Sequence, residues 1–317
     1  MEQTEKRKDM IKVAKLYYFG HMSQDEIAKM MDISRPKVSR MLTAAHQYNI
    51  VRITIKDPLF SNTDAAEKLR THFNLKKVIV VPAGQSKDEA KDNIGKAASD
   101  FLNSCLFDGM KIGISWGTTL NSFVSRFQTG KSFPNTCIVQ LVGGTYNQNM
   151  HMDGRELAKT LAQKVKGKAS ILQTPLLVHN PTLRNLLMEE PETIEHFKLI
   201  EALDMAFVGI GSSNYKNSVL YKANYIEAEE AKELSDMELC DICGHQIDIN
   251  GDEPKTNLKN RHIGISLSGL ANVPMVVALG AGNDKTRSII AAIHGGYLNA
   301  LIIDEIAAIS LLEAEKI

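Results

Sequence analysis

The fold of the first part of this chain is decided by residues 23–46, SQDEIAKMMDISRPKVSRMLTAAH. Ser23 and Glu26 form a capping box, because the Ser hydroxyl accepts from a free helix amide and the Glu side chain reaches back to the Ser amide. Ser34 is a second N-cap candidate, and Pro36 falls in the first turn of the next helix, where a missing N–H costs little. The stretch therefore predicts two short helices separated by a three-residue turn at 31–33.

The second of these helices is amphipathic. Val38, Met41, Leu42 and Ala45 recur at i, i+3, i+4 and i+7 and should be buried, whereas the opposite face is polar and basic. Two capped helices with this turn are typical of a helix-turn-helix, whose second helix enters the major groove of DNA. The expected DNA-binding residues are Ser23, Gln24, Ser34, Arg35, Lys37, Ser39 and Arg40.

The alternative is that two amphipathic helices simply pack in an α-helical core and that their basic residues form a solvated face. We favour DNA binding, because the caps, the turn length and the outward polar residues agree at one place. The flanking segments fit a small DNA-binding module. Residues 5–19 predict a helix, and the alternation of residues 51–56 predicts a strand, which would make the module a winged one.

Composition and charge suggest two domains. The 317 residues are 44% apolar and 23% charged, as in an ordinary globular protein. Residues 1–60 hold 11 basic and 7 acidic residues, whereas the remainder holds 26 and 30, so the basic excess coincides with the proposed DNA module. We expect a helix-turn-helix domain at 1–58 and an effector and oligomerisation domain at 59–317.

The sequence shows neither a membrane-spanning run nor a signal peptide, and we expect a cytoplasmic protein with no membrane partner. Its four cysteines do not suggest a disulfide framework in a chain of this length. Cys240 and Cys243 have the CxxC spacing of a metal or redox site, but no second pair completes four ligands. We therefore expect structural cysteines and no metal.

From residue 77 onward, short apolar strands alternate with helices. The expected strands are 78–81, 111–115, 137–142, 170–173, 205–210, 275–279 and 301–303, with strand-like residues at 242 and 247. The expected helices are 64–73, 88–107, 118–127, 154–165, 227–234, 285–294 and 305–315, with more within 181–203. Fully apolar strands between helices predict an α/β class, with a Rossmann-like parallel sheet covered on both faces.

Ligands of such sheets bind beyond the carboxyl ends of the strands, where three loops are rich in glycine. The loops are GISWGTT at 113–119, QLVGGT at 140–145 and LGAGNDK at 279–285. Hydroxyls and free amides at a helix start make an anion site, and the Lys that ends the third loop adds a positive charge. None is a Walker loop or a GxGxxG fingerprint, so the sequence predicts a phosphorylated small ligand and no ATP, NAD or other cofactor.

Several stretches carry a resemblance to a known family. EIAKMMDISRPKVSRML resembles the DNA-binding segment of the SorC family of bacterial sugar-responsive transcriptional regulators, which includes deoxyribonucleoside and sorbitol regulators. GISWGTT, QLVGG, VGIGS, CDICG, GAGNDK and HGGYLNALIIDE resemble that family's effector domain, so the resemblance covers nearly the whole chain. It implies a domain similar in fold to sugar-phosphate isomerases, a homotetramer, and regulation of carbohydrate or nucleoside catabolism genes through pseudo-palindromic double-stranded operator DNA.

The resemblance also implies roles for particular residues. Thr118 and Thr119 would hold the phosphate of a phosphorylated sugar effector, with Lys285 beside it, and Asp241 would meet the sugar hydroxyls. The full set of expected effector-binding residues is Ser115, Gly117, Thr118, Thr119, Gly143, Gly144, Asp241 and Lys285. Two positions depart from the pattern. Val142 replaces a Lys or Arg found in some relatives, and Cys240 replaces a Gly, so the detailed effector is left open.

Other residues admit two interpretations. Trp116 would either stack on a sugar or fill the core beneath its loop, and Asp304 would face the site or merely start the last helix. His151, His179 and His294 are expected to be surface histidines or histidines satisfied within the fold, and not ligands. A second function class is a sugar-phosphate isomerase or deaminase with an accessory helical module. We expect a regulator and not an enzyme, because the loops supply no evident pair of acid and base.

Overall fold

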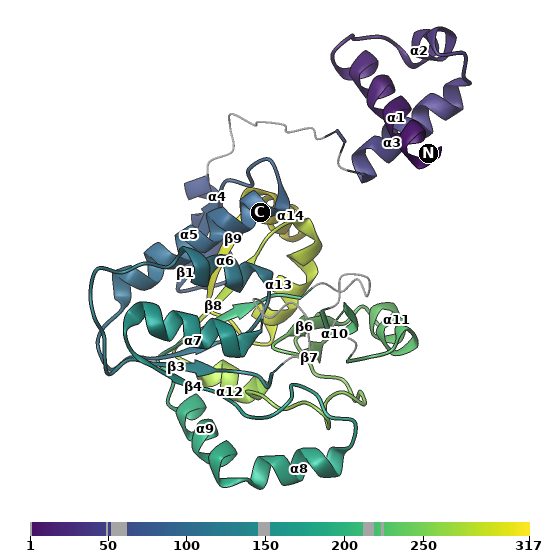
Figure 1. Ribbon diagram of the computed structural model, residues 1–317. Coiled ribbons are helices and arrows are strands. Elements are labelled where there is room, and N and C mark those ends of the chain that lie inside the picture. The colour runs from purple at the N-terminus through teal and green to yellow at the C-terminus, as the bar shows by residue number, and fades with distance from the viewer. Residues whose placement is uncertain (1, 49, 52–61, 145–152, 212–218, 223–224) are drawn as a thin grey trace. The chain divides into compact units, whose positions relative to one another are not determined.

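The computed structural model describes residues 2–48, 50–51, 62–144, 153–211, 219–222 and 225–317 (Figure 1). The chain divides into two compact units, Met1–Pro58 and Leu59–Ile317. No helix among these described residues is both long enough and apolar enough to cross a membrane.

The first unit consists of α1 (Glu2–Tyr18), α2 (Gln24–Met30) and α3 (Arg35–Gln47). The predicted capping box is confirmed, because Glu26 N–H donates to the Ser23 hydroxyl and Ser23 N–H donates to the Glu26 carboxylate at 2.8 Å. Ser34 occupies the N-cap position of α3, but its hydroxyl accepts no capping hydrogen bond. Extended backbone at Ser34 and Pro36 in the first turn therefore start α3 without a side-chain cap.

The three helices enclose one small apolar core, formed by Val13, Ile27, Ala28, Val38 and Leu42. Three of the four predicted core positions of α3 are buried, and the fourth, Met41, is half-buried at the edge. Between α2 and α3 the chain passes through Asp32 with a φ of +51°. An Asp tolerates this left-handed conformation better than most residues, so it makes the tight turn without a glycine.

The second unit is built on a seven-stranded sheet in which every neighbouring pair is parallel. The strands are β1 (Lys77–Val81), β2 (Lys111–Ile114), β3 (Cys137–Gln140), β4 (Lys168–Ser170), β5 (Met205–Gly209), β8 (Met275–Gly280) and β9 (Ala300–Asp304). Their order across the sheet is β1-β9-β8-β5-β2-β3-β4. The predicted α/β class with a parallel sheet is confirmed.

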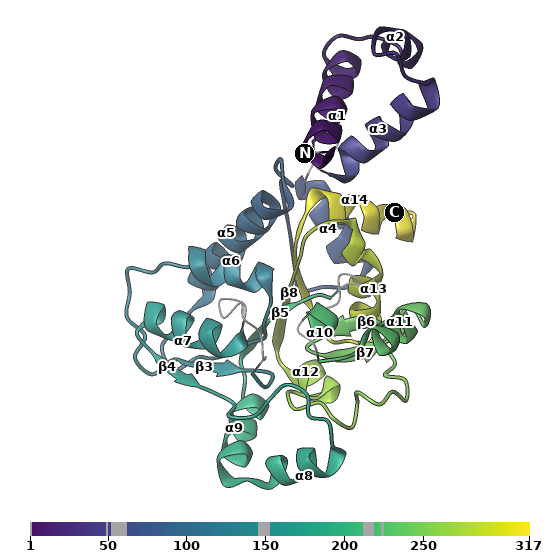
Figure 2. The same ribbon diagram turned by 45° about the vertical axis from the view of Figure 1, so that its right-hand side comes forward.

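Helices cover both faces of the sheet, as the apolar strands required (Figures 1 and 2). α5 (Lys87–Cys105), α6 (Thr118–Arg126) and α7 (Gly154–Val165) bury their apolar faces in one core, together with Ile112, Phe207 and Ile302 of the strands. The other core takes side chains from α4 (Asn62–His72), α9 (Pro191–Glu201), α12 (Leu267–Asn272), α13 (Thr286–His294) and α14 (Glu305–Glu315).

The remaining elements are α8 (Pro181–Glu189), α10 (Val219–Lys222), α11 (Ala228–Asp236), the short turn η3 (Asn283–Lys285) and a hairpin. The hairpin pairs β6 (Cys240–Ile242) with β7 (His245–Ile247) in antiparallel fashion, outside the main sheet. Cys243 and Gly244 join the two strands with φ of +53° and +85°. Both central residues of a type I′ turn need positive φ, so the turn explains this glycine.

The predicted strands of the main sheet lie within one residue of the observed limits at each end, except for two of them. The strand expected at 137–142 ends at Gln140, and Val142 instead forms an isolated antiparallel bridge with Gly264. The strand expected at 170–173 runs from Lys168 to Ser170, because it pairs with β3 only over that length. In both places apolar residues continue past the last ladder hydrogen bond, and Leu141, Val142 and Leu172 are buried there without belonging to a strand.

Candidate functional site

The predicted DNA-binding residues are exposed or half-buried in the first unit. Ser34, Arg35, Lys37, Ser39 and Arg40 are exposed, as is Ser23, and Gln24 is half-buried. Arg35 lies 3.7 Å from Asp25 of α2, but both side chains are about two-thirds exposed (66% and 67%), so the pair is weak. The basic side chains are therefore available to phosphates or base edges, and their contact with DNA stays a prediction.

The predicted wing cannot be placed in the same way. The strand expected at 51–56 lies outside the described residues, apart from Val51, which belongs to no helix or strand. The winged form of the module therefore stays a prediction.

The predicted GISWGTT loop lies where the strand order reverses, and the other two effector loops follow β3 and β8 on either side of it. From β2 the chain continues through β3 and β4 toward one edge, whereas β5, β8 and β9 run toward the other. Ser115 lies at this switch point, since its N–H donates to the Phe207 carbonyl at 3.1 Å and its hydroxyl accepts from Gly209 N–H at 3.3 Å. Open α/β sheets bind their ligands at such a point.

The start of α6 offers an open anion site beside Ser115. Gly117 is its N-cap, with a φ of +122°, and no described side chain caps the helix. Within the described part of the chain, a β-carbon on Gly117 would meet no atom within 4 Å, so those residues leave the space before the helix open. Thr118 is exposed and Thr119 half-buried. The free amides and these hydroxyls can bind an oxyanion, which the positive end of the helix dipole also favours.

Asp241 is brought to the switch point by the β6–β7 hairpin. Gly211 N–H, just past β5, donates to the Asp241 carbonyl at 2.9 Å. The carboxylate accepts from Gln246 Nε2 at 2.9 Å. Burial raises the pKa of Asp241 to about 6, against the opposite effects of His245, Gln246, the Gly244 amide and Lys285. Asp241 can thus accept hydrogen bonds from sugar hydroxyls, although keeping it ionised costs free energy.

Lys285 reaches the same region from the loop after β8. Its ammonium lies 3.7 Å from Asp284 and interacts electrostatically with Asp241. Burial lowers the pKa of Lys285, and the nearby Lys87 lowers it further, whereas the two carboxylates raise it. A bound phosphate would stabilise the charged form of this partly desolvated Lys285 ammonium.

Two buried histidines, His245 and His262, make hydrogen bonds at the β6–β7 hairpin. His245 has Glu253 Oε1 2.6 Å from its Nδ1 and the Ile265 carbonyl 2.8 Å from its Nε2. The neighbouring His262 donates from Nε2 to the Cys243 carbonyl, and burial holds its pKa well below the usual value. Sequence reasoning missed both histidines, although His245 directly follows the CDICG motif.

The two glycines of the QLVGGT loop have structural reasons of their own. A β-carbon on Gly143 would collide with the Pro175 backbone, and one on Gly144 with the Arg155 guanidinium. Their amides are also engaged, since Gly143 N–H donates to the Ile263 carbonyl at 3.0 Å and Gly144 N–H to the Thr174 carbonyl at 2.8 Å. Any part they take in effector binding therefore involves other atoms and stays a prediction.

The residues with two interpretations are now placed. Trp116 is 7% exposed and belongs to the core, and Asp304 both caps α14 and binds the loop of Lys285. His179 and His294 are exposed, whereas His151 lies outside the described residues. Cys240 and Cys243 are buried, and burial raises the pKa of both thiols.

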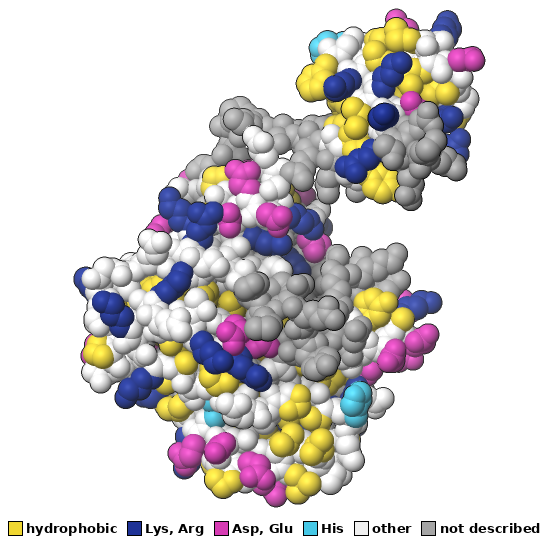
Figure 3. Space-filling view, viewed as in Figure 1, with side chains coloured by type: hydrophobic (Ala, Val, Ile, Leu, Met, Phe, Trp, Pro, Cys, Tyr) yellow, Lys and Arg dark blue, Asp and Glu magenta, His cyan; other side chains and the backbone are white. Residues whose placement is uncertain are grey.

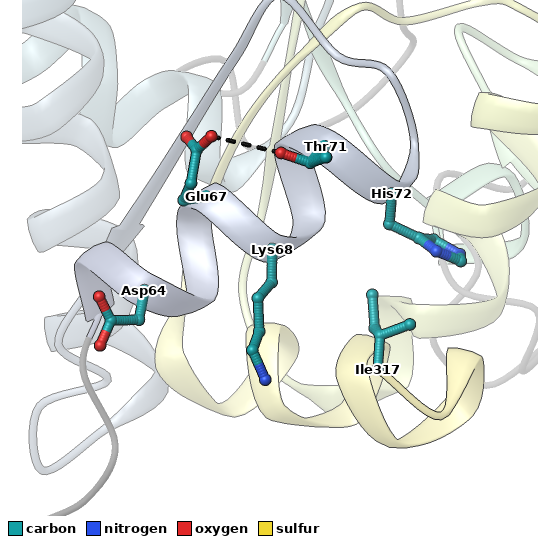
Figure 4. A pocket seen from close by; sticks show the side chains of 6 residues that line it. All are labelled: Asp64, Glu67, Lys68, Thr71, His72 and Ile317. Atoms are coloured by element: carbon teal, nitrogen blue, oxygen red, sulfur yellow. Dashed lines mark hydrogen bonds between the residues drawn. The ribbon is translucent and has the colours of Figure 1, made fainter.

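A separate hollow of about 530 Å³ lies between α4 and the C-terminal residue, far along the chain from these loops (Figure 4). Its lining residues are Asp64, Glu67, Lys68, Thr71, His72 and Ile317. Thr71 donates to Glu67 at 3.3 Å, and the His72 ring lies 2.9 Å from Glu315, so these polar groups are satisfied within the protein. We do not assign the effector to this hollow.

Comparisons with known proteins agree with both units. Residues 57–313 match the family described as "Putative sugar-binding domain". The chain is 29% identical to the sorbitol operon regulator of Klebsiella pneumoniae over 99% of this chain and all of that protein. It is 27% identical to the deoxyribonucleoside regulator of Bacillus subtilis over 97% and 98% of the two chains.

The solved structures include one of full length. The crystal structure of the sorbitol operon regulator SorC from Klebsiella pneumoniae superposes with a TM-score of 0.75 at 28% identity, covering 96% of this chain and 97% of that one. The family model covers most of the sequence, and the relatives span both units. The chain therefore belongs to the SorC family, with its sugar-binding domain at residues 57–313.

Proposed function

We propose that this protein is a DNA-binding transcriptional regulator of a carbohydrate or nucleoside catabolism operon and that a phosphorylated sugar controls it. One observation carries the proposal. A single chain joins an exposed basic helix in a helix-turn-helix to an uncapped helix start at the switch point of a parallel sheet. A regulator needs both parts, one to read DNA and one to sense a small molecule.

The DNA side rests on α3. Its N-terminal half presents Arg35, Lys37 and Arg40 to solvent, while Val38 and Leu42 hold the opposite face in the core. Ser23 and Gln24 at the start of α2 are suited to backbone phosphates, because helix N-termini attract anions. We assign direct base contacts to the middle of α3, where Ser39 and Arg40 lie. A protein acting on operator DNA in bacteria works in the cytoplasm, which is where we place it.

The effector side rests on the loops at the carboxyl ends of the strands. A phosphate would sit on the amides and hydroxyls of Gly117, Thr118 and Thr119, with Lys285 neutralising part of its charge. Ser115 adds a hydroxyl, and Asp241 would accept from the sugar hydroxyls. By family resemblance, Gly143 and Gly144 would line the same site from the neighbouring loop, through atoms other than their amides, which donate to the Ile263 and Thr174 carbonyls.

The chain is a regulator and not an enzyme. The matched relatives are regulators as well. The groups at the site agree with this. Isomerisation needs a base at the substrate carbon with a tuned pKa. Asp241 is the one carboxylate that we assign to the ligand. The Asp304 carboxylate already accepts hydrogen bonds from the main-chain amides of Gly282 and Ala307, so we do not assign it as a base.

Binding a pseudo-palindrome requires a second copy of the DNA module, so we propose a homo-oligomer and, by family resemblance, a homotetramer. α8 supports this role. None of its residues is buried, and Leu183 and Leu186 are 46% and 56% exposed, while Ile194 of the following helix α9 is 43% exposed. Figure 3 shows hydrophobic side chains gathered over this end of the second unit. A second copy of the chain would cover them.

The test uses one protein sample for both activities. Affinity for a duplex from the protein's own upstream region is measured against a random duplex at moderate salt, with and without a panel of phosphorylated pentoses and hexoses. We expect sequence preference and a change of DNA affinity with at least one sugar phosphate. Turnover of a sugar phosphate without sequence-specific DNA binding would instead support the isomerase alternative.

A further inference from the structure

His262 holds the turn of the β6–β7 hairpin, two residues beyond Asp241. Its Nε2 donates to the Cys243 carbonyl at 2.9 Å, and the residue is 4% exposed. The ring also packs on Gly244, where a β-carbon would lie 2.9 Å from Nε2 and 3.0 Å from Cδ2. Cys243 and Gly244 are the two turn residues with positive φ, so His262 contacts the hairpin at its most constrained point.

The His262 ring has little freedom of its own. A β-carbon on Gly264 would lie 2.9 Å from Cε1, so the glycines at 244 and 264 both make room for the ring. The ring of His245 lies 4.3 Å away, centroid to centroid. Burial lowers the pKa of His262, and the nearby His245 and Arg184 lower it further. The ring is therefore neutral and donates from Nε2 as a single tautomer.

Arg184 of α8 fixes the main chain of the same histidine. Its Nε donates to the His262 carbonyl at 3.1 Å, and Arg184 is half-buried. Leu187 and Met188 lie on the same face of α8, one turn further on, and pack against a small apolar cluster that includes Ile263. One face of α8 thus fastens residues 262 and 263, while the His262 side chain extends to the hairpin.

The same segment of main chain borders the effector loops. The Ile263 carbonyl accepts from Gly143 N–H at 3.0 Å. From the hairpin, the Cys243 thiol interacts with the Ser115 hydroxyl at the switch point. A two-stranded hairpin outside the main sheet depends on such outside contacts for its position. The segment that carries His262 supplies one of them, because it is fixed to α8 on one side and to the QLVGGT loop on the other.

We propose that His262 and Arg184 are positioning residues of the effector site, which hold the hairpin where the Asp241 carboxylate meets the sugar hydroxyls. The inference rests on the proposed function and deepens it, because it adds two residues that act on the ligand only through Asp241. Arg184 fixes residue 262, the His262 ring fixes the turn, and the turn fixes Asp241. The start of α6 directly follows β2 of the main sheet, so phosphate binding does not require this support.

The experiment compares the binding of inorganic phosphate with that of ribose 5-phosphate, fructose 6-phosphate and glucose 6-phosphate to the full chain by calorimetry. The sugar preference is the dissociation constant of phosphate divided by that of the tightest sugar phosphate. Arg184→Met should lower the sugar preference about three- to tenfold, the range that corresponds to one hydrogen bond, and leave phosphate binding unchanged. His262→Leu tests the same support from its other end. Arg184→Lys and His262→Gln each retain a donor and should lose less.

A double-mutant cycle shows whether the two residues act through Asp241. In an Asp241→Ala protein, which lacks the carboxylate, Arg184→Met should cause no further loss of sugar preference. Amide hydrogen exchange gives a measure without effector, since Gly211 N–H donates to the Asp241 carbonyl at 2.9 Å and should exchange faster in Arg184→Met. Arg126→Met is the matched control, because Arg126 pairs with Asp92 at 2.6 Å in the last turn of α6 and should change neither quantity.

An unchanged sugar preference in Arg184→Met overturns the inference. An equal loss of phosphate and sugar-phosphate binding also overturns it, because Arg184 would then support the fold in general. A further loss in the Asp241→Ala background, or unchanged exchange at Gly211, contradicts a role through Asp241. A parent protein that binds no sugar phosphate more tightly than phosphate overturns the sugar-phosphate assignment and the inference with it, whereas the other outcomes leave that assignment intact.

Discussion

Gly282 N–H donates to the carboxylate of Asp304, at 3.0 Å from one oxygen and 3.1 Å from the other. The same carboxylate accepts from Ala307 N–H at 2.9 Å and so caps α14. Asp304 is 2% exposed, and burial raises its pKa although both amides lower it. One buried side chain thus fixes the loop that carries Lys285 to the start of the last helix.

Replacing Asp304 tests this link. Asp304→Ala should lower the free energy of unfolding by about 2–4 kcal/mol, because it removes a helix cap and leaves the buried Gly282 amide without an acceptor. Asp304→Asn retains one acceptor oxygen and should cost less. Ser266→Ala removes an ordinary cap from α12 and serves as control, at about 1 kcal/mol. Urea denaturation measures all three, and equal costs for Asp304→Ala and Ser266→Ala would contradict the role of Gly282.

Lys285→Ala should abolish the influence of the effector on DNA affinity while leaving effector-free DNA affinity near the parent value. The reason is that we assign the Lys285 ammonium to the effector phosphate. Lys285 lies in the second unit and does not belong to the DNA module. Thr119→Val should act in the same direction but more weakly, since the backbone amides of α6 remain. Fluorescence anisotropy with labelled operator DNA gives both quantities.

The unphosphorylated sugar is the matched ligand control and should bind far more weakly than its phosphate. If Lys285→Ala responds to the effector like the parent protein, the phosphate lies elsewhere. Loss of effector-free DNA binding in this variant would point to a folding defect, which circular dichroism detects.

Asp241→Asn should stabilise the effector-free protein above pH 6. The pKa of Asp241 is raised to about 6 in the folded state, chiefly by burial. The folded protein therefore holds this proton more tightly than the unfolded chain does, so its free energy of unfolding falls as pH rises from about 4 to 6. Asp241→Asn removes the penalty, which is worth up to about 3 kcal/mol above that window and vanishes below it. A difference that grows as pH falls would show the opposite sign.

Arg40→Ala should weaken operator binding by about 1–3 kcal/mol if the side chain reads a base, and it should relax sequence preference at one position. Arg40 is exposed on α3, and its Nε lies 3.4 Å from the Pro36 carbonyl, a weak contact that DNA can replace. Arg126→Ala in the second unit is the control and should leave DNA affinity unchanged. If the parent protein shows no sequence preference at moderate salt, the proposed regulator function fails.

Residues 62–317 should remain an oligomer without the DNA module, since we assign self-association to the second unit. Leu186→Asp in the full chain should weaken that assembly, because it places a charge among the exposed apolar side chains of α8. Light scattering at micromolar concentration measures both. A monomeric fragment would contradict the assignment, whereas an oligomeric fragment with an unaffected Leu186→Asp variant would move the contact to another surface.

The sequence by itself determined the elements and the fold class. The capping box at Ser23, Pro36 in a first turn and apolar strands such as 275–279 are local signals, and each acts within a few residues. Fully apolar strands alternating with helices also required a parallel sheet covered on both faces. The Gly-rich loops could be ranked as ligand sites for the same reason, because parallel strands bring their carboxyl ends to one edge.

Only the tertiary structure decided what each loop residue contacts. Gly143 and Gly144 looked like sites of ligand approach, but Pro175 and Arg155 occupy the space beside them. The antiparallel hairpin that carries Asp241 to the end of β5 depends on a hydrogen bond to Gly211, thirty residues away. Such contacts between distant segments are set by packing, and sequence periodicity carries no record of them.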